Sequence, residues 1–158
     1  MQFTFVAAAA LFGAAMAAPA PQANEIHESL TITKFSARKT DLKGTLDGPV
    51  SHIDFQLIKS VEEGTMGFVC TADAAEGETG IKTGNNSYRC NGGTDTKNYA
   101  FSLKAVKDQS TFQLLMIHQV APAYGYQANV EIPTYCRAGG AETMICDQVA
   151  DVTANLHL

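Results

Sequence analysis

Four histidines and a group of carboxylates are the side chains of this chain that could carry acid–base or metal chemistry. No H-x-H or H-E-x-x-H spacing joins any two histidines, so the paired ligands of common zinc sites are missing. The acidic residues lie in Gly- and Ala-rich stretches, where solvated charge is the ordinary state, and nothing indicates two carboxylates facing across a cleft. The histidines are His27, His52, His118 and His157, and the acidic residues are Glu62, Glu63, Asp73, Glu76 and Glu78.

The sequence also lacks motifs for a catalytic nucleophile and for phosphate binding. No G-x-S-x-G elbow occurs, and Asn91-Gly92-Gly93 is not followed by a helical pattern that could cradle a phosphate. His118 ends a strongly apolar stretch, and a hydrogen-bonded histidine at a strand end is the expectation there rather than a base or ligand. We therefore predict that the chain is not an enzyme and holds no catalytic residue, cofactor or metal.

The cysteines indicate an oxidising compartment. The chain has four, an even set that predicts two disulfides in an exported protein. Three pairings are possible, and the nearest-neighbour pairing needs only local closure, with each bridge contributing about 3 kcal/mol in the chain-entropy model. A zinc site is the alternative, but no C-x-x-C spacing is present and no histidine lies near a cysteine in the sequence. The favoured bridges are Cys70–Cys90 and Cys136–Cys146.

The chain begins with a segment that predicts export. Residues 1–17 carry no charged side chain, are too short for a comfortable membrane span, and end in the small-x-small sequence Ala15-Met16-Ala17. We interpret them as a signal peptide, with a buried helix of a cytosolic protein as the less favoured alternative. Residues 18–27, rich in Pro and Ala, predict a flexible lead-in, and residues 28–158 predict one secreted domain.

Charge excludes one class of partner. The net charge is −5 and the 11 Lys and Arg residues are scattered, so no basic stripe exists for phosphate contacts and nucleic acid is not expected. No second apolar stretch follows residues 1–17, so no membrane association is expected either.

Period-two hydrophobicity dominates the rest of the chain. Apolar residues alternate with polar ones in the stretches 30–33, 52–57, 99–104, 126–132 and 152–158, with Gly- and Asn-rich turns between them. This pattern predicts an all-β domain, a single antiparallel β-barrel or sandwich. The stretch 112–117 is apolar at every position except Gln113, which favours a central strand covered on both sides over a face that a ligand or partner covers. Asn85 begins the glycosylation sequon Asn85-Asn86-Ser87.

The C-terminal region carries the most specific local pattern. Tyr135-Cys136-Arg137-Ala138-Gly139-Gly140 is followed by Cys146 and by Val149-Ala150-Asp151, and this pattern resembles the Alternaria major-allergen family of fungal secreted β-barrel proteins. Further similarity lies in Met1-Gln2-Phe3-Thr4, in Ile32-Thr33-Lys34-Phe35 with Arg38-Lys39, in Phe68-x-Cys70, in Tyr88-x-Cys90 and in Ile132-Pro133-x-Tyr135-Cys136. The resemblance covers most of the residues after the signal peptide.

The resemblance implies a barrel of about eleven antiparallel strands with bridges at positions 70/90 and 136/146. It also implies an extracellular protein, associated with the fungal cell wall or spore surface, without catalytic machinery. Members of the family act as elicitors, as virulence proteins that engage plant defence proteins of the thaumatin-like class, or as allergens. The family's intermolecular cysteine has no counterpart near residues 23–29, which implies a monomer or a non-covalent dimer.

Three functions are consistent with these features. The favoured one is an elicitor, effector or allergen that binds a host defence protein. The alternative is an extracellular carrier of a small apolar or aromatic ligand, because small barrels either hold one ligand or fill with side chains. A wall hydrolase ranks last, since no pair of facing carboxylates is indicated.

Overall fold

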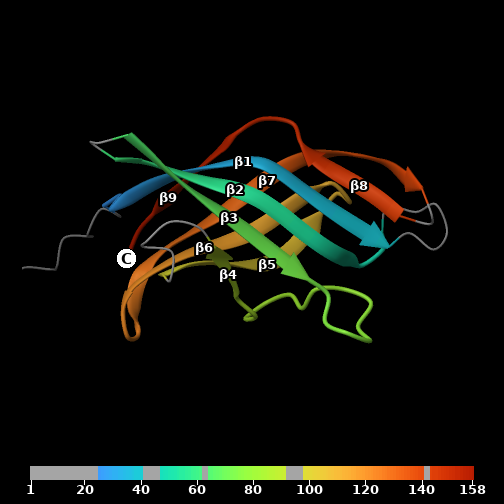
Figure 1. Cartoon of the computed structure of the whole chain (residues 1–158), viewed down its shortest axis with the longest axis horizontal. Coiled ribbons are helices and arrows are strands. Elements are labelled where there is room, and N and C mark those ends of the chain that lie inside the picture. The colour runs from blue at the N-terminus through green and yellow to red at the C-terminus, as the bar shows by residue number, and fades with distance from the viewer. Residues whose placement is uncertain (1–24, 41–46, 62–63, 92–97, 141–142) are drawn as a thin grey trace, which may run out of the picture.

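The computed structural model describes residues 25–40, 47–61, 64–91, 98–140 and 143–158, and the predicted signal peptide lies outside them. The described residues form nine strands and no α-helix, as expected for an all-β domain (Figure 1). None of them forms a helix long and apolar enough to cross a membrane. The strands are β1 (Glu28–Thr40), β2 (Val50–Val61), β3 (Gly64–Asp73), β4 (Tyr88–Asn91), β5 (Tyr99–Lys107), β6 (Thr111–Ala121), β7 (Tyr124–Gly140), β8 (Thr143–Gln148) and β9 (Val152–Leu156).

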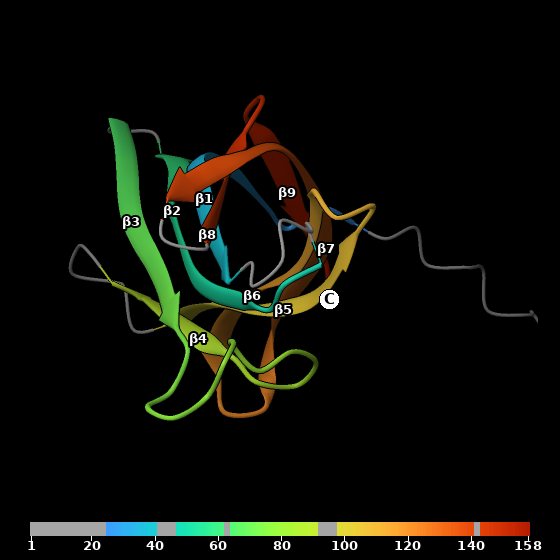
Figure 2. The same cartoon turned by 90° about the vertical axis from the view of Figure 1, so that its right-hand side faces the viewer.

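All pairings between the strands of the described residues are antiparallel, and together they close into a barrel. The order runs β2-β3-β4-β5-β6-β7-β8-β1-β9, and β1 also pairs with β2, which joins the two ends (Figure 2). The β8 and β9 strands share one side of β1: β9 pairs with Glu28–Ile32 and β8 with Ser36–Thr40. The predicted fold class is confirmed, with nine strands in the described residues rather than the eleven implied by the resemblance.

Two strands change direction or partner along their length. In β1 the register shifts between Thr33 and Ser36, and Lys34 there has a positive φ of 54°. The Gln148 side chain supports this bulge, because its amide donates to Ile32 O and its oxygen accepts from the N–H of Phe35. The long β7 pairs with β6 as far as Pro133 and with β8 from Thr134 onward, so it spans both halves of the barrel.

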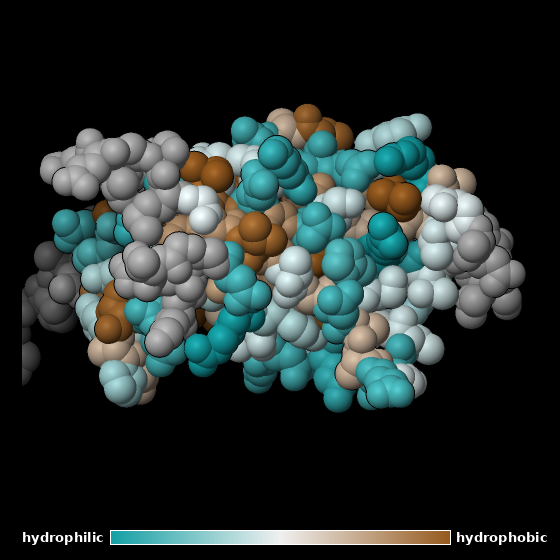
Figure 3. All heavy atoms as spheres, viewed as in Figure 1, coloured by the Kyte–Doolittle hydropathy of each residue, from teal (hydrophilic) through white to brown (hydrophobic). Residues whose placement is uncertain are grey.

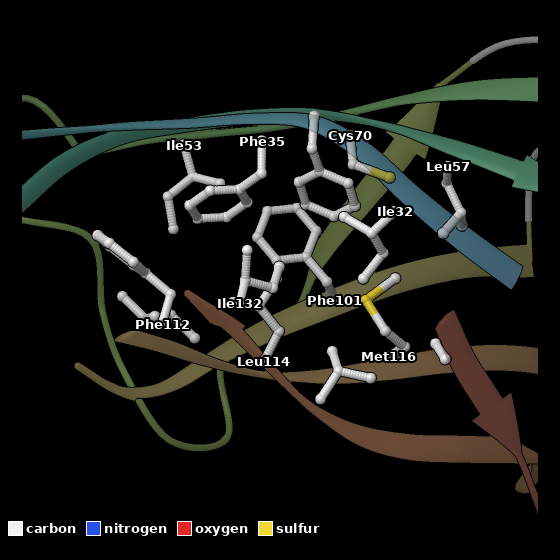
Figure 4. Close-up of a cluster of buried hydrophobic side chains, with 14 of the residues drawn as sticks. Ile32, Phe35, Ile53, Leu57, Cys70, Phe101, Phe112, Leu114, Met116 and Ile132 are labelled. Atoms are coloured by element: carbon white, nitrogen blue, oxygen red, sulfur yellow. The ribbon is translucent and has the colours of Figure 1, made fainter. Parts of the chain in front are cut away.

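Side chains fill the barrel interior. The rings of Phe35 and Phe112 lie 5.0 Å apart and those of Phe55 and Phe101 lie 4.9 Å apart, centre to centre. Figure 4 shows these strands directing aromatic and aliphatic side chains toward one another, with Met116 and Leu114 from β6. Burial of this apolar surface is the main force that stabilises the fold. It also counts against a carrier that would hold its ligand in the lumen.

The β6 strand is covered on one face only. Phe112, Leu114 and Met116 are buried, whereas Leu115 and Ile117 on the opposite face are half-buried. The expectation of a strand covered on both sides is therefore wrong. Antiparallel strands in a single barrel have one face on the core and the other toward solvent, and no second layer of the described residues covers this one.

Both disulfides join nearest neighbours. Cys70 on β3 bonds to Cys90 on β4, and Cys136 on β7 bonds to Cys146 on β8, so all four cysteines pair within the chain. The two bridges differ in context. The β7–β8 ladder has six residue pairs, whereas the described residues of β3 and β4 have two, Val69 with Asn91 and Cys70 with Cys90.

Candidate functional site

A charged cluster closes one end of the barrel interior. Glu28, Lys59, Tyr99 and His118 each occupy the inward position next beyond the apolar core, two residues from Leu30, Leu57, Phe101 and Met116 respectively. The Glu28 carboxylate lies 2.5 Å from Lys59 Nζ, accepts a 2.6 Å hydrogen bond from the Tyr99 hydroxyl, and lies 2.6 Å from His118 Nδ1. We call these four residues the Glu28 cluster.

The Glu28 cluster is well shielded from solvent. The Glu28 side chain is 7% exposed and that of His118 is 16% exposed. Burial raises the pKa of Glu28, but the hydrogen bonds from Lys59 and Tyr99 and the interaction with His118 outweigh it and hold that pKa below its usual value. The carboxylate is therefore charged and bound by Lys59, Tyr99 and His118. This arrangement is that of a structural ion pair rather than that of a catalytic acid or base.

Aromatic rings extend the cluster to the barrel rim. The His118 ring stacks on Tyr99 at 4.2 Å, and the His27 ring stacks on Tyr126 at 4.7 Å. The Tyr126 ring also meets His118 edge-on, and Tyr124 meets Tyr126 in the same way. Desolvation and the neighbouring Tyr124 raise the pKa of the Tyr126 hydroxyl. His118 is thus a satisfied strand-end histidine, in agreement with the sequence-based prediction.

A bulge shapes the β6–β7 hairpin above these rings. The register between the strands shifts between Gln119 and Ala121, and Ala123 in the turn has a positive φ of 59°. Gly125 faces His118 so closely that a Cβ atom would lie 2.4 Å from the His118 carbonyl oxygen. Only glycine permits this approach, so the sequence Tyr124-Gly125-Tyr126 sets how tightly the hairpin tip folds.

An open groove runs across the outside of the barrel beside this hairpin. Its base is a row of cross-strand neighbours on four strands, in which Arg89 pairs with Ala100, Ala100 with Ile117, and Ile117 with Gln127. Gln119 and Tyr124 contribute to its lining, and the cavity volume is about 350 Å³. We call this feature the outer groove. The outer groove lies on the face of β6 that the sequence pattern predicted to be covered by other parts of the chain.

The remaining histidines and acidic residues do not gather into a site. His52 and His157 lie on the polar phase of their strands, which favours solvent exposure, but both are half-buried. His52 lies between Asp73, at 2.6 Å, and Asp54, at 3.2 Å, and His157 lies against β7. Glu76 and Glu78 are exposed. Glu62 and Glu63 lie outside the described residues. Within the described ranges, no group of three or more His, Cys, Asp or Glu residues could hold a metal ion.

Lys39 is a buried cation that sequence reasoning treated as one of the scattered surface charges. It continues the inward phase of Phe35 and Ala37 on β1, is 2% exposed, and donates a 2.7 Å hydrogen bond to the Gln109 carbonyl oxygen. Burial lowers its pKa, and the carboxylate of Asp47 partly opposes this effect. The two-residue periodicity of β1 was the signal that could have revealed it.

The motif of Tyr135 and Arg137 forms a second exposed surface at the β7–β8 pair. Tyr135 is 69% exposed and Val149 is 60% exposed, and Tyr135 pairs in register with Asp147. The Arg137 guanidinium donates to the Asp147 carboxylate. We call these four residues the hairpin face. Arg137 is thus an exposed, hydrogen-bonded residue.

Asn85 of the glycosylation sequon is exposed, as an acceptor must be, in the loop between β3 and β4. It lies two residues before Ser87, which lines the outer groove.

A family model for "Alternaria alternata allergen 1" matches residues 32–146, from Ile32 in β1 to Cys146 of the second disulfide. The chain belongs to this family. Its strongest motif, at Tyr135-Cys136-Arg137, forms the ladder that carries the Cys136–Cys146 bridge. The resemblance inferred from the sequence is confirmed.

Two curated relatives extend the match over nearly the whole chain. An effector protein, PevD1 of Verticillium dahliae, is 34% identical over 94% of this chain and 88% of its own length. The major allergen Alt a 1 of Alternaria alternata is 30% identical over 99% of this chain and 96% of its own length. A crystal structure of Alt a 1 superposes with a TM-score of 0.60 at 28% identity, covering 88% of this chain and 95% of that one. The chain is an effector- or allergen-type fungal protein, which implies an extracellular location.

Proposed function

We propose that this protein is a secreted, non-enzymatic fungal effector that binds a plant defence protein of the thaumatin-like class outside the fungal cell. The observation that carries the proposal is the 34% identity to an effector protein over 94% of the chain. The geometry supports it, because the histidines and the buried carboxylate are all engaged by neighbouring groups of the chain.

We assign the binding of the host protein to the hairpin face. Tyr135 pairs with Asp147, which forms an ion pair with Arg137, and the exposed Val149 follows β8 with its N–H bonded to Pro133 O. Tyr and Arg are the residue types most enriched among the residues that dominate binding energy at protein interfaces. On the face of the molecule that Figure 3 shows, exposed hydrophobic residues lie singly or in small groups among hydrophilic ones.

A pull-down from plant apoplast fluid tests the proposal. The mature protein is immobilised and retained proteins are identified, with a purified thaumatin-like protein as the direct probe. Wild type is expected to retain it, and Tyr135→Ala is expected to weaken binding at least about tenfold, as for a central aromatic anchor. Tyr124→Ala, an exposed tyrosine in the outer groove, is the matched control and is expected to bind as wild type.

Leaf infiltration tests the effector function itself. Purified protein is expected to induce necrosis or defence-gene expression in host leaves. Absence of any response, together with no retained thaumatin-like protein, would refute the proposal. Extraction of fungal walls and spores, followed by immunodetection, tests the further proposal that part of the protein stays associated with the cell wall or spore surface.

A further inference from the structure

The glycosylation sequon is anchored beside the outer groove. The N–H of Gly84 donates a 2.9 Å hydrogen bond to Leu103 O, and the Lys104 ammonium donates to Gly84 O at 2.9 Å. These bonds fix the chain before Asn85 against β5. Asn85 and Ser87 are both exposed, and two residues of chain span at most about 7 Å. Because Ser87 lines the groove, a glycan attached to Asn85 begins at the edge of the groove.

The outer faces of the strands lead from the sequon into the groove. Tyr88 of β4 pairs with Phe101, which brings the preceding Ser87 beside the outer faces of β5 and β6. Along β6 the next outward side chains are Leu115 and Ile117, about 7 Å apart, and Ile117 forms the base of the groove. A sugar chain that starts at the sequon and follows this direction lies over the half-buried apolar face of β6.

The charge of the groove suits a neutral occupant. The guanidinium of Arg89 interacts with other groups of the chain, and the remaining described residues that line the groove carry no charge. The sugars attached first to asparagine in an N-linked glycan are N-acetylglucosamine rings, which are uncharged. Such a ring offers hydroxyl groups, an acetamido N–H and carbonyl, and an acetamido methyl group.

The side chains of the groove match these groups. Gln119 and Gln127 carry exposed amides that both donate and accept, as the hydroxyls and the acetamido group require. Ala100 and Ile117 pair across β5 and β6 and form an apolar base for the acetamido methyl group. Tyr124, 48% exposed, supplies a flat ring whose apolar face suits the C–H side of a sugar. At about 350 Å³ the groove falls within the size range of small-molecule sites.

We propose that Asn85 carries an N-linked glycan and that the outer groove binds the first sugars of this glycan. A lipid-pyrophosphate-linked oligosaccharide is the donor during secretion. Asn85 Nδ2 forms a bond to the anomeric carbon, the bond from that carbon to the pyrophosphate oxygen breaks, and Nδ2 loses one proton as the lipid pyrophosphate leaves. The glycan then covers Ile117 and packs against Tyr124.

The bound glycan supplies the cover over the outer face of β6 that no described strand provides. Covalent attachment makes weak contacts sufficient, because a tethered ligand has an effective concentration in the millimolar range. This goes beyond the proposed function, because the groove and the hairpin face consist of different residues. Tyr135 stays accessible to a host protein.

Nitration of exposed tyrosines by tetranitromethane tests the proposal. Secreted protein from a glycosylating eukaryotic host is compared with the same protein after enzymatic removal of the glycan under native conditions. Peptide mass spectrometry measures the occupancy of Asn85 and the nitration of Tyr124 and Tyr135. Tyr124 is expected to react about threefold or more slowly in the glycosylated protein, since the slowing equals one plus the ratio of effective concentration to Kd. Tyr135, 69% exposed on the hairpin face, is the internal control and is expected to react equally in both forms.

Protein variants separate a bound glycan from a mobile one. The double substitution Gln119→Ala/Gln127→Ala removes both amides and is expected to weaken the contact about tenfold, so that Tyr124 reacts at nearly the same rate with and without the glycan. Gln56→Ala changes a half-buried glutamine on β2, outside the groove, and is expected to preserve the slowing. Nuclear Overhauser contacts between the acetamido methyl protons and Ile117 are expected in the glycosylated protein.

Each remaining result overturns the proposal. An unmodified Asn85 in the secreted protein rejects the glycan itself. Equal rates for Tyr124 with and without the glycan show that the groove does not bind it. Slowing of Tyr124 and Tyr135 alike, or slowing that persists in the Gln119→Ala/Gln127→Ala protein, shows a mobile glycan that shields the surface without occupying the groove.

Discussion

The Glu28 carboxylate lies 2.6 Å from Nδ1 of His118, although the two residues are 90 positions apart in the chain. The contact joins the first residue of β1 to the far end of β6, and Lys59 and Tyr99 bring β2 and β5 to the same oxygen atoms. One carboxylate thus connects four strands at the end of the barrel. The core ends here because the interior beyond it is charged and satisfied rather than apolar.

Replacing Glu28 by Gln is expected to lower the free energy of unfolding by about 2–3 kcal/mol, because Lys59 would keep a partly buried charge without its counter-charge. Urea denaturation measures the change. Glu131→Gln is the matched control, because Glu131 forms an exposed pair with Lys107 at 2.5 Å that solvent screens. An equal effect of the two substitutions would contradict the special role of the buried pair.

Acid is expected to weaken the fold through Glu28. Because its pKa in the folded protein lies below the usual 4.5, the carboxylate's contribution to stability is complete above that pH and disappears as pH falls through the folded-state pKa. The difference in unfolding free energy between wild type and Glu28→Gln should therefore shrink as pH is lowered below about 4.5. A difference that stays constant down to the acid transition would show that Glu28 does not titrate in this way.

The two disulfides are expected to differ in importance. In the chain-entropy model, loss of either bridge costs about 3 kcal/mol, slightly more for the longer loop. Removing Cys70–Cys90 should lower the free energy of unfolding by more than its longer loop predicts. The reason is that the described residues of β3 and β4 share only two paired positions. Thermal melting of Cys70→Ala/Cys90→Ala and Cys136→Ala/Cys146→Ala proteins makes the comparison. The prediction fails if the Cys136–Cys146 variant is the less stable.

Gly125→Ala is expected to destabilise the protein by about 1–3 kcal/mol, because a Cβ 2.4 Å from the His118 carbonyl oxygen forces the hairpin backbone to move. Amide chemical shifts of Gln119 and Tyr124 should change with it. Gly67→Ala is the control, since its Cβ would meet only Ile58 Cδ1 at an ordinary 3.6 Å. Similar stabilities of the two variants would show that the hairpin adapts without strain.

Much of the fold was predictable because strand patterning is local. Alternation of residues such as Ile53, Phe55 and Leu57 places one face of a strand on a core in any antiparallel barrel. The cysteine pairing was predictable for the same reason, because each bridge joins adjacent strands. Whether another layer covers the outer face of β6 could not be predicted. Residues such as Leu115 and Ile117 are apolar whether another layer or only a groove lies over them.

The strand content, the inward and outward phases of the strands, the local disulfides and the family can all be predicted from the amino-acid sequence. Only the tertiary structure brought Glu28, Lys59, Tyr99 and His118 onto one set of atoms, and only it aligned Arg89, Ala100, Ile117 and Gln127 into one groove. The physical reason is the distance along the chain over which each interaction acts. Periodicity and turn chemistry act between near neighbours in the chain, whereas barrel closure sets the register of strands dozens of residues apart, and both the cluster and the groove exist only in that register.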